Sequence, residues 1–223
     1  MTYRSRKQQR FLAYAAHDLR GSITLQRALA EVALADPDAD VGALREMGER
    51  VVAACQRQEQ LLEALLTLTR SACARLPREH VDLAATAAEV LQAHDHRGLR
   101  SSTTLELART TGDPRLVERL VENLVANAVA HNVPGGRFDI VTCTSAGRAV
   151  FAIANTGPLI PPGELRQLFQ PFHRLSPRGT SAEGVGLGLA IVQAVADAHH
   201  ARVTARARTG GGLGIDVAFP ALA

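Results

Sequence analysis

The chain has 223 residues, of which 46% are hydrophobic and 21% are charged. This is enough for one large domain or two small ones, each with its own core. No apolar run approaches the ~18 residues that suggest a membrane span, and the basic start of the chain is not followed by the apolar stretch of a signal peptide. The net charge is only +3, with acidic residues between the basic ones, which disfavours nucleic acid as a partner. We therefore expect a soluble, cytoplasmic chain without direct membrane contact.

Cysteine and lysine usage excludes two further classes. Cys55, Cys73 and Cys143 are odd in number, far apart and free of Cys-x-x-Cys spacing, which favours reduced thiols over disulfides or a zinc site. Lys7 is the only lysine, whereas a Walker-type phosphate loop needs Gly-Lys-Ser/Thr. The chain therefore has no such loop.

The first third of the chain predicts two helices. Apolar or small residues recur at alternating spacings of three and four between residues 4 and 34, the pattern of a coiled-coil seam. The segment 36–40 then breaks the helix, and a second seam ends before Pro77. The first seam consists of Leu12, Ala16, Leu19, Ile23, Gln26, Ala30 and Ala33, and the second of Leu44, Met47, Val51, Ala54, Gln58, Leu61, Leu65 and Leu68. Together they predict an antiparallel helical hairpin, which we expect to form a domain over residues 1–75.

The apolar faces of this hairpin are wider than one partner helix can cover. Leu62 and Leu66 lie beside the main stripe, so that two copies would bury them by pairing into a four-helix bundle. We therefore expect a homodimer formed through the hairpin.

After Pro77 the pattern changes to mixed helix and strand, with an expected second domain over residues 76–223. The sequence predicts a helix over 81–93, a strand over 103–107 and a helix from Asp113-Pro114 to about His131. Two strands over 138–144 and 149–154 are joined by a hairpin turn. A segment rich in Pro, Gly and Ser precedes a helix over 186–199 and a closing hairpin of strands 201–207 and 214–219. The order predicts an α+β sandwich, one sheet with helices on one face.

The first motif surrounds His17. The segment 11–20 places this histidine between the seam residues Ala16 and Leu19, so its imidazole should face solvent. Taken alone, a surface histidine without a role is the more common case. The segment, however, resembles the phospho-acceptor box of the sensor histidine kinases of bacterial two-component systems. That resemblance implies that His17 accepts the γ-phosphoryl group of ATP and passes it to an aspartate on a response regulator receiver domain. Asp18 can hold or remove the proton of the second ring nitrogen.

The second motif is the asparagine pair of the helix predicted to end near His131. Asn123 and Asn127 are four residues apart and therefore point the same way. The segment 122–132 resembles the asparagine box of the same family, which implies nucleotide contacts for Asn123, Asn127 and His131 and makes Asn127 an oxygen ligand of Mg²⁺. The alternative is a pair used for capping or core hydrogen bonds.

The third motif, at residues 155–160, stands where the family usually has Asp-x-Gly-x-Gly. The resemblance implies that Asn155 takes the place of the aspartate that accepts a hydrogen bond from the adenine amino group, with Gly157 beside it. An amide can present either its oxygen or its NH₂ group, so we expect weaker discrimination between adenine and guanine than a carboxylate gives.

Two further motifs complete the resemblance. Residues 168–174 are similar to the family's phenylalanine box, which implies that Arg174 reaches the γ-phosphate. Gly184, Gly186, Leu187 and Gly188 are similar to the glycine box that opens a helix, whose backbone N–H groups would face the phosphates. The segment between Asn155 and this box is expected to form the ATP lid.

Departures from the family pattern keep two alternatives open. Gly21 stands four residues after the histidine, where relatives carry the side chain that supports dephosphorylation of the regulator, so we do not expect phosphatase activity. The first alternative is a dimeric scaffold that binds nucleotide without catalysis, which is compatible with the atypical residues Gly21, Ala130, Asn155 and Leu159. The second alternative is a gyrase-like ATPase. Because sensor kinases usually carry an input domain and membrane helices, we expect a fragment of a larger membrane-anchored protein.

Overall fold

The computed structural model describes residues 21, 23–24, 26–28, 30–35, 40–71, 77–161, 163–173 and 186–222. The chain forms two compact units, Met1–Leu65 and Leu66–Ala223. The boundary between them falls inside one helix, α2 (Val41–Ser71).

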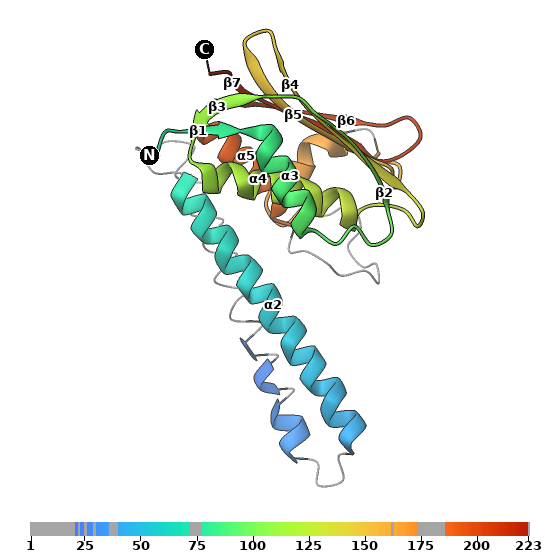
Figure 1. Cartoon of the computed structure of the whole chain (residues 1–223). Helices are drawn as coiled ribbons and strands as arrows, with labels where there is room; N and C mark the ends of the chain where they lie inside the picture. Colours follow the sequence, from blue (N-terminus) through green and yellow to red (C-terminus); the bar gives the residue numbers. More distant parts are fainter. Residues whose placement is uncertain are drawn as a thin grey trace. The chain divides into compact units, whose positions relative to one another are not determined.

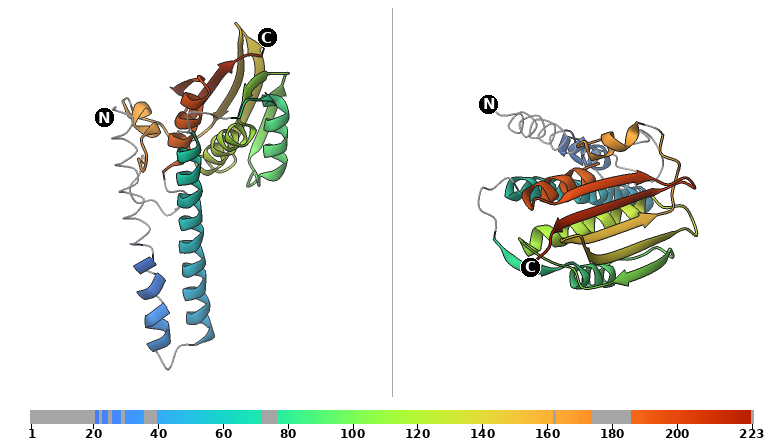
Figure 2. Two further views of the ribbon diagram at one scale, coloured as in Figure 1. Left: turned by 90° about the vertical axis from the view of Figure 1, so that its left-hand side faces the viewer. Right: turned by 90° about the horizontal axis from the view of Figure 1, so that it is seen from above.

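In the first unit, the described residues between 21 and 35 are helical and run alongside α2 (Figures 1 and 2). The Asp40 side chain accepts a hydrogen bond from the Ala43 amide over 2.7 Å and so begins α2. Ala54 and Leu61 of the predicted seam are 1% and 3% exposed, whereas Leu62 is 49% exposed. The hairpin is thus confirmed for the described residues. None of the helices described in the chain is both long and apolar enough to span a membrane.

The second unit is built on a five-stranded sheet (Figure 1). Its strands are β2 (Arg100–Leu105), β4 (Arg137–Ser145), β5 (Arg148–Asn155), β7 (Leu213–Pro220) and β6 (Arg202–Ala207), in that spatial order. β2 pairs with β4 in parallel, and the other pairs are antiparallel. A separate two-stranded sheet pairs β1 (Glu79–Asp82) with β3 (Arg109–Gly112).

One face of the large sheet is covered by helices α3 (Leu83–Ala93), α4 (Pro114–Ala130) and α5 (Gly188–Ala198) (Figure 2). Strand residues alternate accordingly: Phe151 and Ile153 are buried against the helices, while Ala152 between them is half-exposed. A short 3₁₀ helix, η1 (Glu164–Phe169), follows β5. This arrangement confirms the predicted α+β class.

The first helix of the second unit begins later than predicted. Val81 and Asp82 pair with Thr110 and Arg109 in β1 and β3, so the helix begins only at Leu83. Asp82 caps it by accepting a hydrogen bond from the Ala84 amide over 3.0 Å. Strands β1 and β3 were absent from the sequence prediction.

A buried polar cluster surrounds the first residues of α4. Asp113 caps this helix, because its Oδ1 accepts hydrogen bonds from the Arg115 and Leu116 amides. The Asp113 N–H donates to Nε2 of His199 over 3.0 Å, and the His199 Nδ1 lies 2.8 Å from the Val195 carbonyl oxygen. Since an N–H only donates and a carbonyl only accepts, His199 is neutral and carries its proton on Nδ1.

We expect the free energy of unfolding to fall as the pH is lowered below 6.5. Burial lowers the pKa of His199 from its ordinary value of 6.5, and Arg78 and His200 act in the same direction, against the hydrogen bond to Val195 and the charge of Asp113. Below pH 6.5 the unfolded chain takes up a proton on His199 that the folded chain excludes. The contribution of neutral His199 to the free energy of unfolding is therefore complete above pH 6.5 and is lost on acidification. Denaturant titrations at pH 7.5 and 5.5 should show a smaller pH effect in His199→Gln, which cannot titrate. An equal pH effect in both proteins would contradict the assignment.

Candidate functional site

Three of the predicted site residues lie on the second half of α4. Asn123 and Asn127 are half-buried, and His131 is exposed just after the last helical residue. The opposite side of the helix is buried through Leu120, Leu124 and other apolar residues. An amphipathic helix of this kind must hold its core side against the sheet, which leaves the asparagines facing away from the core.

Asn123 faces the beginning of α5. Its Nδ2 donates a hydrogen bond to the Arg119 carbonyl over 2.6 Å. Its Oδ1 would lie 3.1 Å from a Cβ atom at Gly188, so a larger side chain at that position would crowd the asparagine. The asparagine motif and the glycine motif, which lie far apart in the sequence, are therefore neighbours in the fold.

The glycine motif presents backbone rather than side chains. Leu187 is 4% exposed, which places its side chain in the core. Gly186 has a positive φ of 74°, and its carbonyl accepts a hydrogen bond from the Phe172 amide over 2.9 Å. Leu187 thus anchors the beginning of α5, and only its main chain is available to a ligand.

Asn127 has a polar side chain that folding does not use. Within the part of the chain that the structure describes, its amide makes no hydrogen bond, although the residue is only half-exposed. Its oxygen is a hard ligand of the kind that Mg²⁺ takes, alongside water and phosphate oxygens. His, Cys, Asp and Glu side chains form no metal-binding group among the described residues. The amide oxygen of Asn127 is thus a donor of the type that fits Mg²⁺.

Asn155 lies at the end of β5 and is 4% exposed. Its Nδ2 donates a hydrogen bond to the Thr156 carbonyl oxygen over 2.7 Å. Turning the amide over would place its oxygen against that carbonyl oxygen, which has no proton to donate. One N–H of the NH₂ group is therefore bonded within the protein, and this bond fixes which side of the amide the oxygen, the group that can accept from a base, occupies. This changes the expectation from the sequence, in which either end of the amide was available.

The ends of β5 and α4 are joined by side chains that the sequence analysis did not select. The Thr156 hydroxyl donates to the Asn132 Oδ1 over 2.6 Å, and the Asn132 Nδ2 donates to the Ala128 carbonyl. A Cβ atom at Gly157 would lie 2.6 Å from the His131 carbonyl oxygen, so this position accepts only glycine. The one signal in the sequence was the position of Asn132 as the last residue of the asparagine motif.

Three consecutive glycines, Gly210, Gly211 and Gly212, include two that pack against the backbone of Asn155 and Gly157. Gly212 has a φ of 98° and donates from its amide to the Pro158 carbonyl over 3.0 Å. A Cβ atom here would collide with the Asn155 carbonyl oxygen, and one at Gly211 would collide with that of Gly157. From the sequence, these glycines are expected only to form the turn between the strands predicted over 201–207 and 214–219. Three consecutive glycines are more than such a turn requires, and this excess was the missed signal.

Four of the predicted residues cannot be placed. His17, Asp18, Arg174 and Gly184 lie outside the described residues. Those that the structure does describe, Asn123, Asn127, His131, Asn155, Gly157, Gly186, Leu187 and Gly188, gather around the second half of α4 and the adjoining ends of β5 and α5.

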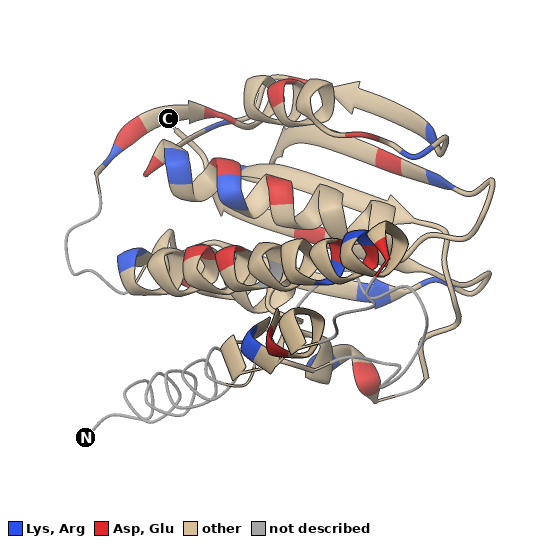
Figure 3. Ribbon diagram, turned by 90° about the horizontal axis from the view of Figure 1, so that it is seen from below, with Lys and Arg blue, Asp and Glu red and all other residues tan. Residues whose placement is uncertain are grey.

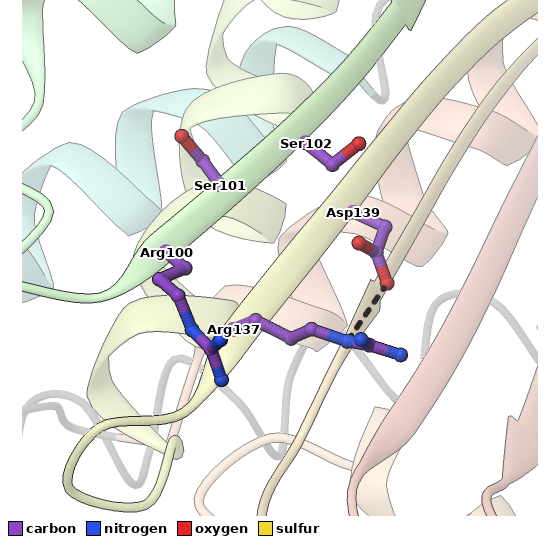
Figure 4. A pocket seen from close by; sticks show the side chains of 5 residues that line it. All are labelled: Arg100, Ser101, Ser102, Arg137 and Asp139. Carbon is purple, nitrogen blue, oxygen red and sulfur yellow. Dashed lines mark ion pairs between the residues drawn. The ribbon is translucent and has the colours of Figure 1, made fainter.

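A separate hollow of about 260 Å³ lies on the face of the sheet opposite the helices (Figure 4). It is lined by Arg100, Ser101, Ser102, Arg137 and Asp139, with 3.8 Å between Arg137 Nε and Asp139 Oδ2. Acidic and basic residues are interspersed along the helices of this unit (Figure 3). The hollow includes none of the predicted site residues.

Comparison with known proteins gives matches over both parts of the chain. Residues 112–223 match the family model of the histidine kinase-, DNA gyrase B- and HSP90-like ATPases. Residues 7–73 match that of the His kinase A phospho-acceptor domain. Sensor protein CutS of Streptomyces coelicolor is 42% identical over 219 residues, covering 96% of this chain and 53% of that protein. Sensor protein kinase PmrB of Pseudomonas aeruginosa is 31% identical over 222 residues, covering 96% of this chain and 46% of that protein. The chain thus spans about half the length of the curated relatives it matches.

Solved structures share the fold. Histidine kinase AdeS of Acinetobacter baumannii aligns with a TM-score of 0.67 at 22% identity, over 92% of this chain and 97% of that one. Histidine kinase ThkA, solved in complex with the response regulator protein TrrA, aligns with a TM-score of 0.70 at 18% identity, over 99% of this chain and 64% of that one.

Proposed function

The chain belongs to the bacterial sensor histidine kinases, and from this membership we propose that it phosphorylates its own His17 with ATP and passes the phosphoryl group to a response regulator. The supporting observation is the meeting of motifs that are far apart in the sequence. Asn123 of α4 faces Gly188 of α5, and His131 packs against Gly157. These are the positions for which the resemblance implies nucleotide contacts.

The proposed division of labour follows the two regions of the chain. Residues 1–75 would form the dimerisation and phosphotransfer domain, and residues 76–223 the catalytic ATP-binding domain. The exposed Val52, Leu62 and Leu66 of α2, at 56%, 49% and 68%, support pairing of two hairpins in a homodimer.

The proposed reaction has two steps. One ring nitrogen of His17 attacks the γ-phosphorus, an N–P bond forms, the bond to the β–γ bridging oxygen breaks, and ADP leaves. Asp18 holds the proton of the other ring nitrogen as positive charge develops on the imidazole. In the second step an aspartate carboxylate of a receiver domain attacks the phosphorus and the N–P bond breaks, which restores the imidazole.

The catalytic unit would hold the nucleotide through the described site and the motifs beyond it. The Asn155 oxygen would accept from the adenine amino group, and the main chain from Gly184 to Gly188 would face the phosphates. Asn127 would hold Mg²⁺, which neutralises phosphate charge when bound. Arg174 would reach the γ-phosphate. Because Lys7 is the only lysine of the chain, Arg174 would neutralise much of the phosphate charge that Mg²⁺ leaves.

The proposed partner is the receiver domain of a response regulator. The structurally similar ThkA was solved with a response regulator protein, and the reaction needs an aspartate acceptor. We further propose that the chain is part of a longer protein, because the relatives it matches are about twice as long, and, from the resemblance to sensor kinases, that this protein is membrane-anchored with the chain in the cytoplasm.

Incubation with γ-labelled ATP and Mg²⁺ tests the proposal. We expect acid-labile, base-stable label on the chain, and its transfer to a receiver domain. If ATP is hydrolysed without label on the chain, the gyrase-like alternative is correct. Bound nucleotide with neither label nor hydrolysis would identify a non-catalytic scaffold.

Competition between ATP and GTP tests the orientation of Asn155. We expect ATP to displace a fluorescent ATP analogue about tenfold more effectively than GTP, because the guanine carbonyl oxygen would face the Asn155 oxygen without a proton between them. In Asn155→Ala, which lacks the oxygen, the preference should largely disappear. Equal displacement by ATP and GTP in the unmodified chain would instead support the ambiguity expected from the sequence.

A further inference from the structure

The last turn of α2 is tied to the first turn of α4 by an ion pair. Residues from Leu66 onward belong to the second compact unit, and among them Arg70 approaches Asp113. The Arg70 Nε and Nη2 atoms both lie 2.7 Å from the Asp113 Oδ2. The side chain of Asp113 is 1% exposed and that of Arg70 is 41% exposed. A partly exposed cation thus reaches into the protein to neutralise a buried carboxylate.

This carboxylate has two tasks at once. Its Oδ1 caps α4 through the Arg115 and Leu116 amides, and its Oδ2 receives Arg70. Within the described part of the chain, Arg70 is the only basic side chain that pairs with it. A buried carboxylate without its cation is strongly destabilised. If Arg70 moves away, Asp113 must therefore move toward water, and it then releases the cap of the helix.

α4 connects this ion pair to the nucleotide site. Asp113 immediately precedes the helix, and Asn127 lies about 20 Å further along it, at 1.5 Å per residue. The helix between them is held against the sheet by buried Leu116, Leu120 and Leu124. From the other side, His199 of the segment after α5 accepts the Asp113 backbone N–H. The first turn of α4 is thus fixed by both α2 and α5, and its position sets that of Asn123 and Asn127.

We propose that Arg70 and Asp113 are positioning residues of the nucleotide site, which couple the asparagines of α4 to the last turn of α2. The coupling rests on the proposed function, because it requires Asn123 and Asn127 to contact the nucleotide. By thermodynamic reciprocity, a nucleotide that orders α4 must also order the last turn of α2, to the same extent that this turn favours nucleotide binding. The last turn of α2 is therefore connected to the ligand through Asp113 and α4.

Hydrogen exchange of the full chain, with and without ADP and Mg²⁺, tests the coupling. ADP should slow exchange in residues 66–71 as well as in the first turn of α4. In Arg70→Ala, the effect of ADP on residues 66–71 should vanish, and ADP affinity should fall about fivefold or more. Arg70→Lys keeps the charge without the second contact and should retain part of both effects. Arg50→Ala, which removes an exposed pair with Glu46 on the same helix, should change neither.

The outcomes separate this coupling from the proposed function. If ADP fails to bind the unmodified chain, the proposed nucleotide site is wrong, and the proposed coupling is wrong as well. If ADP binds and residues 66–71 exchange at the same rate with and without it, or Arg70→Ala keeps the full ADP effect, only the coupling is overturned. Should Arg70→Ala fail to fold, as judged by circular dichroism, Arg70→Lys decides: unchanged ADP affinity and unchanged protection in that variant contradict the proposal.

Discussion

His17→Ala is expected to abolish the transfer of label from γ-labelled ATP to the chain while leaving ADP binding unchanged. The label can form only on a nitrogen that is free to attack phosphorus. Two other imidazoles have one nitrogen engaged: the His96 Nε2 lies 3.1 Å from the Leu91 carbonyl oxygen, and the His173 Nε2 lies 3.0 Å from the Glu164 Oε2. Both nitrogens of the buried His199 are bonded within the protein.

A second histidine serves as the matched control. His80 is exposed on β1, outside the residues that gather at the candidate site. His80→Ala should therefore incorporate label at the rate of the unmodified chain. Acid-labile, base-stable label that persists in His17→Ala would place the acceptor on another histidine and would overturn the assignment of the phospho-acceptor box.

Asn127→Ala is expected to slow labelling about a hundredfold or more at a fixed concentration of ATP and Mg²⁺. The loss follows from removing a metal ligand at the position where charge builds up on the phosphates. The same change should cost little stability, because the Asn127 amide makes no hydrogen bond within the described residues and alanine is the better helix former. Labelling rates, the Mg²⁺ dependence of ADP binding and thermal unfolding together check this expectation.

The control for Asn127 lies on the same helix. Glu118 is exposed on α4, well before the asparagines, and Glu118→Ala should leave both labelling and ADP binding unchanged. If Asn127→Ala labels at the normal rate, Asn127 is not the ligand. If it loses thermal stability in parallel with activity, the amide has a structural role that its surroundings do not indicate.

Much of the fold could be predicted because it depends on neighbours in the sequence. The beginning of α4 follows from the Asp113 cap and from Pro114 at the first helical position. The seam of α2 follows from a spacing of three and four residues, and β4 and β5 follow from alternation around a short turn. Each of these signals lies within a few residues of the feature that it predicts.

Pairings between distant residues could not be predicted in this way. Val81 was assigned to a helix because its neighbours favour one, whereas its partner in the two-stranded sheet is Thr110. The parallel pairing of β2 with β4 has no local signal either, since the turn chemistry that identifies a hairpin is absent from a crossover connection.

The same division holds for the site. The sequence by itself determined which residue types are present, namely the asparagines four apart on one helix and the glycines that open another. Only the tertiary structure decided how Asn155 is oriented, because the Thr156 carbonyl uses its NH₂ group. It also decided that Gly212 packs against the Asn155 backbone and that Arg70 neutralises Asp113. The physical reason is that a side chain's chemistry is set by its own atoms, whereas its free hydrogen-bonding groups and its charge balance are set by whatever the folded chain places against it.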